Sequence, residues 1–155
     1  MGNIIVIYHS QQYGDTKILA EALAKGAREV GAKVNLINTN DRRVTLEEVL
    51  SADAVAIGTP DYFSYVAGTI KTLFDDIYLW DQSGKSVKGK HAVLFFSHGG
   101  GGAVRGPFES LARRFFRQVG ETVESERPTS NEAKTKCVAL GKELARGLNS
   151  RTFQK

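Results

Sequence analysis

Hydrophobic and polar positions follow two periods along the chain, one typical of buried strands and one typical of amphipathic helices. The run Asn3–Tyr8 is apolar after its first residue, the pattern of a strand covered on both faces of a parallel sheet. From Asp15 to Val30 apolar residues recur at helical spacing, and Gly31 stands where a helix end is expected. The pattern therefore predicts a strand followed by a helix at the start of the sequence.

The same alternation continues along the rest of the chain, with no internal repeat or low-complexity segment. Thr45, followed three residues later by Glu48, predicts the capped start of a short helix. The other predicted elements are strands at 33–38, 53–58, 91–96 and 122–126, and helices at 66–80, at 108–119 and after Pro128. The strand at 122–126 is polar, as expected at the edge of a sheet.

Five predicted strands alternating with helices indicate an α/β fold. Right-handed crossovers between parallel strands place helices on both faces of one sheet, so we expect a doubly wound three-layer sandwich. We expect a single domain over residues 1–155, with 150–155 as a loose C-terminal tail. Ligands of such sheets bind outside the carboxyl ends of the strands, which directs attention to the loops after the first, third and fourth strands.

Composition is that of an ordinary globular chain, with 155 residues, 41% hydrophobic and 25% charged. The apolar runs are far shorter than the roughly 20 residues of a membrane-spanning helix. No secretory signal pattern is present, so we expect a cytoplasmic protein. Cys137 is the one cysteine and cannot close an internal disulfide, and the three histidines, His9, His91 and His98, lack metal-ligand spacing. We therefore expect no metal site.

The formal net charge is +4, and basic residues concentrate between positions 85 and 117, where Glu109 is the one acidic residue. They are Lys85, Lys88, Lys90, Arg105, Arg113, Arg114 and Arg117. This segment is either a docking surface for an acidic partner or a solvated face. Nucleic acid is disfavoured as a partner, because aromatic residues do not alternate with the basic ones and no binding motif is present.

The turn after the first strand is rich in hydroxyl and amide groups. Its residues are Ser10, Gln11, Gln12, Tyr13, Gly14, Asp15 and Thr16. It delivers backbone N–H groups at a helix N-terminus, a geometry that binds a phosphate without a cation. It lacks both the Walker motif and the G-x-G-x-x-G fingerprint, so nucleotide hydrolysis and standard dinucleotide binding are disfavoured. A simple helix-capping turn is the alternative.

The turn after the third strand places two adjacent aromatic residues at the ligand edge. Its residues are Gly58, Thr59, Pro60, Asp61, Tyr62, Phe63 and Ser64. A planar heteroaromatic ligand stacked on such rings would be stabilised by roughly 1–3 kcal/mol. The alternative is that the rings only cover the core at the start of the next helix.

The turn after the fourth strand, Ser97 and His98 followed by Gly99–Gly102, is rich in glycine. Glycines let the backbone approach a ligand closely, in conformations that other residues resist. A flexible connecting loop is the alternative. His9 and His98 both lie at the expected ligand edge; we expect His9 to pack at the strand end and His98 to contribute mainly its backbone.

In this order the three loops resemble those of the flavodoxin-like family, and the resemblance covers essentially the whole chain. It implies strand order 2-1-3-4-5, FMN bound at the carboxyl edge, and redox chemistry supplied by the flavin with no catalytic side chain. The phosphate contacts that it implies are Ser10, Gln12, Gly14, Asp15 and Thr16. Gln11 and Tyr13 share that loop, which is one residue longer than usual in the family. The ring contacts that it implies are Thr59, Pro60, Asp61, Tyr62 and Phe63 on one face and at N5, and Ser97, His98, Gly99 and Gly100 at the pyrimidine end.

Two functions fit this resemblance. We favour an electron carrier that serves a redox protein partner docked near the FMN edge, a partner that is acidic if the basic segment is its docking surface. The end of the chain (Pro128, Cys137, Leu140 and Gly141) resembles flavodoxin modules of electron-transfer flavoproteins. The alternative is an NAD(P)H-dependent quinone or flavin oxidoreductase. It is favoured by a third loop without Trp or Tyr, which leaves the outer ring face open, and by the basic segment. The sequence leaves the oligomeric state open.

A phosphorylated receiver domain has the same five-strand architecture and is the non-redox alternative. It requires an acidic cluster after the first strand and an aspartate at the end of the third. Here the first strand ends in His9 and Ser10, and Asp61 lies beyond Thr59 and Pro60. The receiver interpretation is therefore disfavoured.

Overall fold

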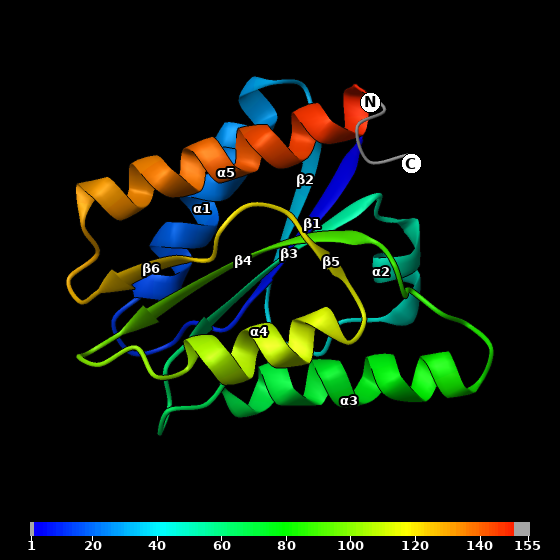
Figure 1. Cartoon of the computed structure of the whole chain (residues 1–155), viewed down its shortest axis with the longest axis horizontal. Helices are drawn as coiled ribbons and strands as arrows, with labels where there is room; N and C mark the ends of the chain where they lie inside the picture. The colour runs from blue at the N-terminus through cyan, green and yellow to red at the C-terminus, as the bar shows by residue number, and fades with distance from the viewer. Residues whose placement is uncertain (1, 151–155) are drawn as a thin grey trace.

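A computed structural model of the chain describes residues 2–150 as a three-layer α/β sandwich (Figure 1). The elements are β1 (Asn3–Tyr8), α1 (Asp15–Glu29), β2 (Lys33–Asn38), α2 (Leu46–Ser51), β3 (Ala54–Pro60), α3 (Gly68–Gln82), β4 (His91–His98), α4 (Arg105–Arg113), β5 (Arg117–Gln118), β6 (Val123–Glu126) and α5 (Asn131–Asn149). The sheet order is β2-β1-β3-β4-β5, all parallel, with β6 also paired to β4. The predicted fold class and strand order are confirmed.

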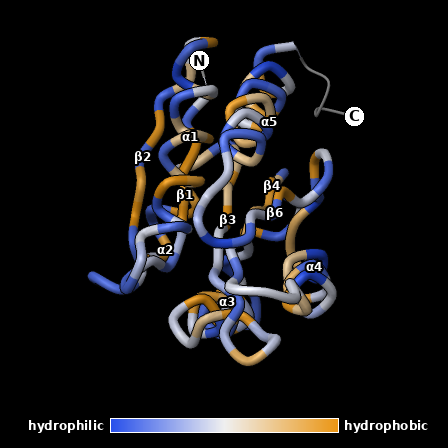
Figure 2. The backbone as a smooth tube through the Cα atoms, turned by 90° about the vertical axis from the view of Figure 1, so that its left-hand side faces the viewer, coloured by the Kyte–Doolittle hydropathy of each residue, from blue (hydrophilic) through white to orange (hydrophobic). Residues whose placement is uncertain are grey.

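The core consists of two apolar layers, one on each face of the sheet. Helices α1 and α5 cover one face, where Leu19 and Leu144 share a buried cluster with Val6. Helices α2, α3 and α4 cover the other face, where Ile70 shares a buried cluster with Ile5. Figure 2 shows the apolar strands between the two helix layers. Because alternate residues of β1 face opposite layers and both layers are closed, the strand is a continuous apolar run.

The register brings the carboxyl ends of the central strands to one edge. Tyr8 at the end of β1 is paired with Gly58 of β3, and Pro60 at the end of β3 is paired with Ser97 of β4. The loops that follow these strands lie together at the left of Figure 1, and the loop between α3 and β4 lies at the opposite end. The three loops singled out in the sequence therefore share one edge of the sheet.

The fourth helix and the fifth strand differ from the prediction. Helical spacing predicted a helix over 108–119, whereas α4 ends at Arg113 and β5 follows at once. Phe116 packs in the layer of α3 and α4, and Val119 packs in the layer of α1 and α5. These side chains serve opposite faces of the sheet, as residues of an extended edge segment do. The predicted edge strand at 122–126 is β6, beside the end of β4, and β5, beside the start of β4, is an additional two-residue strand inside the segment predicted as a helix.

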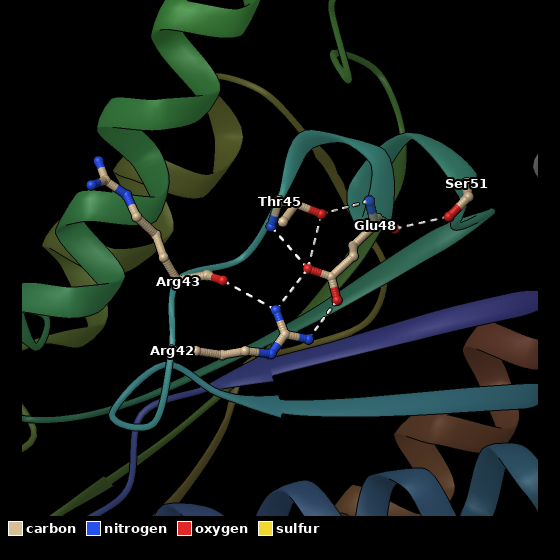
Figure 3. A network of polar contacts seen from close by, with 5 residues as sticks. All are labelled: Arg42, Arg43, Thr45, Glu48 and Ser51. Atoms are coloured by element: carbon tan, nitrogen blue, oxygen red, sulfur yellow. Dashed lines mark hydrogen bonds and ion pairs between the residues drawn. The ribbon is translucent and has the colours of Figure 1, made fainter.

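The short helix α2 begins with the capping box that the sequence predicts. The Thr45 hydroxyl accepts a hydrogen bond from the Glu48 N–H, and the Glu48 carboxylate accepts one from the Thr45 N–H (Figure 3). Arg42 donates two hydrogen bonds to the same carboxylate, at 2.9 and 2.6 Å. The hydrogen bonds from Arg42 hold the pKa of Glu48 at about 2, below its usual 4.5. At the other end of the chain, Ser150 caps α5, and the rest of the predicted tail, 151–155, lies outside the described residues.

Candidate flavin-binding site

One cavity of about 220 Å³ opens at the carboxyl edge of the sheet. It is lined by Ser10, Gln11, Gln12, Tyr13, Gly14, Asp15, Thr16, Pro60, Asp61, Tyr62, Ser97, His98, Gly99 and Arg127. Three separate segments of sequence, each placed in the predicted site, thus meet around one volume. Thr59, Phe63 and Gly100 are the predicted site residues that do not line it.

The first loop is rigidly held at its start and open at its end. The Asn38 side chain accepts a hydrogen bond from the Ser10 N–H at 3.1 Å and donates one to the Ser10 carbonyl at 2.8 Å. At the end of the loop Gly14 has a positive φ of 75° and is the N-cap of α1, and no side chain caps this helix. The first N–H groups of a helix have no acceptor within it. They are therefore available to an anion, and the helix dipole favours one there.

Two hydroxyl contacts, one buried and one partly buried, fix this loop to the rest of the site. Thr16, at the start of α1, lies 2.8 Å from the Ser97 hydroxyl of β4. His9 is buried, its Nδ1 lies 2.7 Å from the Thr69 hydroxyl, and burial lowers its pKa. The His9 ring also contacts Tyr62 edge-on, at 5.7 Å between ring centres. The side chain of His9 packs at the strand end, as the sequence predicts.

The second loop presents Tyr62 to the cavity on a tight turn. Tyr62 and Tyr65 exchange two backbone hydrogen bonds, and the residues between them, Phe63 and Ser64, have positive φ values of 58° and 63°. Side chains resist this conformation, so the turn is strained. The Asp61 carboxylate offsets the strain by accepting hydrogen bonds from the Ser64 N–H and the Val104 N–H. Tyr62 also accepts a hydrogen bond from the Gln11 side chain, which joins the first two loops.

Two residues of this loop lie away from the cavity. Thr59 is fully buried, and its hydroxyl accepts a hydrogen bond from the Ala67 N–H at the start of α3. Phe63 is fully exposed and lines a neighbouring hollow together with the glycines of the third loop, Gly100 among them. Thr59 therefore anchors the loop to the start of α3, and Phe63 lies at the rim of the cavity.

The third loop brings His98 to the cavity. Its Nε2 lies 3.4 Å from the Glu124 carboxylate, and its buried Nδ1 has no hydrogen-bond partner among the described residues. Its carbonyl accepts a hydrogen bond from the Arg127 N–H at 2.8 Å. A Cβ built at Gly99 would meet no atom within 4 Å, so this part of the loop borders open space.

Arg127, which follows β6, is the site residue that sequence reasoning missed. Its guanidinium carbon lies 3.9 Å from the centre of the Tyr13 ring. The segment after it is held to α1 because the Asp15 carboxylate accepts hydrogen bonds from the Thr129 N–H and hydroxyl. The one sequence signal that could have identified Arg127 was the polar edge strand before it, because the carboxyl end of that strand lies at the same edge of the sheet as the cavity.

The basic segment 85–117 does not form one face beside the cavity, contrary to one interpretation of the sequence. Arg117 is paired with His91 at the start of β4, and Lys90 donates hydrogen bonds to the carbonyls of Leu50 and Ala52, ahead of β3. These positions are at the amino edge of the sheet. Arg105 is the member of the segment near the cavity, and it forms an ion pair with Glu124 at 2.9 Å. An acidic partner at the cavity would not be held by this segment as a whole.

Residues 2–150 contain neither a metal-binding cluster nor a membrane-spanning helix. Within them no group of three or more His, Cys, Asp and Glu side chains is arranged to hold a metal ion. None of their helices has the length and apolar character needed to cross a membrane.

Fold and cavity together define a doubly wound α/β protein with an uncapped helix N-terminus and an aromatic loop at the carboxyl edge of its sheet. The family model described as Flavodoxin matches residues 6–141. A flavodoxin from Aquifex aeolicus is 34% identical over 94% of this chain and 86% of its own length. The chain belongs to the flavodoxin family, whose members bind flavin.

Two further relatives are spanned only in part by this chain. It covers 36% of a coenzyme F420H(2) oxidase from Methanothermobacter thermautotrophicus, at 28% identity over 94% of the chain. An NAD(P)H dehydrogenase (quinone) from Caulobacter vibrioides is 28% identical over 64% of this chain and 60% of its own length. Among solved structures, a flavodoxin from the domain Archaea superposes with a TM-score of 0.79 at 22% identity, over 95% of this chain and 99% of its own.

Proposed function

We propose that this protein is an electron carrier that binds FMN in the cavity at the carboxyl edge and exchanges electrons with a protein partner. The observation that carries the proposal is the convergence of the uncapped α1 N-terminus, Tyr62 and the third loop around one volume. The Aquifex protein, which aligns with 94% of this chain over 86% of its own length, is named a flavodoxin. A single domain and a cytoplasmic location belong to the same proposal.

The residues of the cavity fit such a cofactor. A Cβ at Gly14 or Gly99 would stand in open space, so the backbone of both loops is accessible to a ligand. The buried Nδ1 of His98, which has no partner among the described residues, is a polar atom that a ligand could satisfy. These features supply N–H donors at one end of the cavity and an aromatic ring with a polar rim at the other.

Each group has a separate task in this proposal. The backbone N–H groups at Gly14, Asp15 and Thr16 bind the phosphate, together with the polar side chains of Ser10, Gln11 and Gln12. Tyr62 stacks on the ring, with Pro60 and Asp61 fixing its turn, and Ser97–Gly99 border the opposite end. When bound, FMN supplies reversible electron uptake, and no side chain acts as acid or base. Phe63 and Gly100 at the rim lie where a partner would approach.

The reductase alternative keeps the same cavity and differs in what approaches it. It is favoured by the third loop, which offers no Trp or Tyr to cover the outer face of the ring, and by the Caulobacter relative named a quinone dehydrogenase. A nicotinamide or quinone would then stack directly on the exposed ring.

An anaerobic reductive titration of the FMN-loaded protein, followed by its visible spectrum, separates the two functions. We expect dithionite to reduce the flavin in two distinguishable one-electron stages, and NADPH to have no effect. Rapid two-electron bleaching by NADPH would favour the reductase. A spectrum identical to that of free FMN throughout would contradict the cofactor assignment itself.

A further inference from the structure

A cation lines the cavity beside the first loop, although that loop contains no Lys or Arg. Arg127 is the one Lys or Arg side chain among the residues that line the cavity. It comes from the segment after β6, more than a hundred residues away from that loop in the sequence. Its position depends on the fold and not on the local motif.

Three contacts hold Arg127 at this place. Its backbone N–H donates to the His98 carbonyl, and its guanidinium stacks on the Tyr13 ring at 3.9 Å. The hydrogen bonds from Thr129 to Asp15 attach the following residues to the first turn of α1. An exposed arginine without such contacts samples many rotamers, whereas stacking on an aromatic ring fixes the planar guanidinium at little cost.

The charge of Arg127 is not matched by a carboxylate. Among residues 2–150, no Asp or Glu oxygen lies within 4.0 Å of its guanidinium nitrogens. Asp15 is the acidic residue in the first turn of α1, and its carboxylate accepts hydrogen bonds from Thr129. A cation near a helix N-terminus is electrostatically unfavourable, because that end of the helix dipole is positive. A bound dianion between the two would make both interactions favourable.

We propose that Arg127, fixed by Tyr13, supplies positive charge to the phosphate of the bound flavin and so selects phosphorylated flavin over its unphosphorylated form. This inference rests on the proposed function, because it assumes that the cavity holds a flavin. It adds a charge-assisted contact to the N–H donors of α1. Binding of the phosphorylated ligand therefore weakens as salt rises, since the guanidinium is exposed.

The test is a comparison of FMN and riboflavin binding to the apoprotein, measured by quenching of flavin fluorescence at low and high salt. The two ligands differ only in the phosphate, so the riboflavin dissociation constant corrects for any change in ring binding or folding. The variants are Arg127→Gln, Arg127→Lys and, as a control, Arg114→Gln. Arg114 is exposed at the end of α4, toward the amino edge of the sheet.

We expect Arg127→Gln to weaken FMN binding at least about tenfold more than riboflavin binding, the size of one hydrogen bond to a charged group. The salt dependence of FMN binding should fall with it, Arg127→Lys should retain part of the preference, and Arg114→Gln should match the wild type. Tyr13→Leu should reproduce part of the loss, with no further phosphate-specific loss when combined with Arg127→Gln.

Equal losses for FMN and riboflavin in Arg127→Gln would overturn this inference and leave the proposed function standing. An equal phosphate-specific loss in Arg114→Gln would also overturn it, because the effect would then come from net charge. Failure of the wild-type protein to bind either flavin would overturn the proposed function, and the inference with it.

Discussion

Replacing a glycine by alanine inside a helix normally raises stability. At the contact between α1 and α5 we expect the same replacement to lower it. Replacing Gly26 in α1 by alanine would place the new Cβ 2.0 Å from the Val138 carbonyl oxygen of α5. Gly141 of α5 has the reciprocal geometry, with its Cβ 2.1 Å from the Leu23 carbonyl oxygen of α1. Ordinary van der Waals contact begins at 3.4 Å, so the two helices must separate by more than an ångström. Neither neighbour is a flexible side chain that could turn away.

The magnitude follows from two opposing effects. Alanine in place of glycine inside a helix gains about 1 kcal/mol. Overpacking typically costs about 1–3 kcal/mol, and the upper end or more applies here because the clash is with backbone. We therefore expect Gly26→Ala to lower the free energy of unfolding by about 2 kcal/mol, and the melting temperature by roughly 4–8 °C.

Urea and thermal unfolding followed by circular dichroism measure this effect, with Gly106→Ala as the matched control. A Cβ at Gly106, in the first turn of α4, would meet no atom within 4 Å, so that variant should be as stable as the wild type or up to about 1 kcal/mol more stable. If Gly26→Ala proves as stable as the wild type, the close approach of α1 and α5 is wrong. The position of the α1 N-terminus in the cavity would then be in question as well.

Four further predictions concern single residues. Glu48→Gln should lower stability by about 1 kcal/mol or less at neutral pH, because glutamine keeps the capping box but removes the negative charge that pairs with Arg42. Because the pKa of Glu48 is depressed to about 2 in the folded protein, this difference should shrink as pH falls from 4.5 toward 2, and a difference independent of pH in thermal melts would contradict the pairing. Ser64→Gly should raise the free energy of unfolding in urea by about 1 kcal/mol, since glycine adopts its φ of 63° without strain; a loss of stability would show that the turn is not strained. Burial raises the pKa of Cys137 to about 12, so iodoacetamide should label it only after denaturation, and rapid labelling of the native protein would refute its place in the core. His98→Ala should leave FMN bound with a dissociation constant changed by less than about tenfold, because the loop contributes mainly its backbone; loss of the cofactor in a fluorescence titration would contradict that role.

The sheet and the positions of the three loops could be predicted from sequence because their signals are local. A continuous apolar run such as Asn3–Tyr8 specifies a strand buried on both faces, and the alternation with helices specifies a parallel order. The carboxyl ends of those strands then have to meet at one edge.

The end of α4, the division of the basic segment and the position of Arg127 could not be predicted in this way. They depend on which face or edge of the sheet each residue lies at, and the spacing of apolar residues along the sequence does not specify that. The apolar residues from 108 to 119 have helical spacing, yet Phe116 and Val119 pack in different layers, so α4 ends early. The basic segment is compact in sequence but is divided between the two edges of the sheet, because β4 carries the chain from one edge to the other. Arg127 enters the cavity through the edge strand β6, far from any motif.

The measurement that tests the central claim most directly is a map of backbone amide chemical shifts in the ¹⁵N-labelled apoprotein as FMN is added. The account predicts saturation at one equivalent, with the largest changes in residues 10–16, 61–62 and 97–99, and little change at the amino edge around Lys90 and Arg117. Changes centred at the amino edge, or no change at all, would contradict the assignment of the carboxyl-edge cavity as a flavin site.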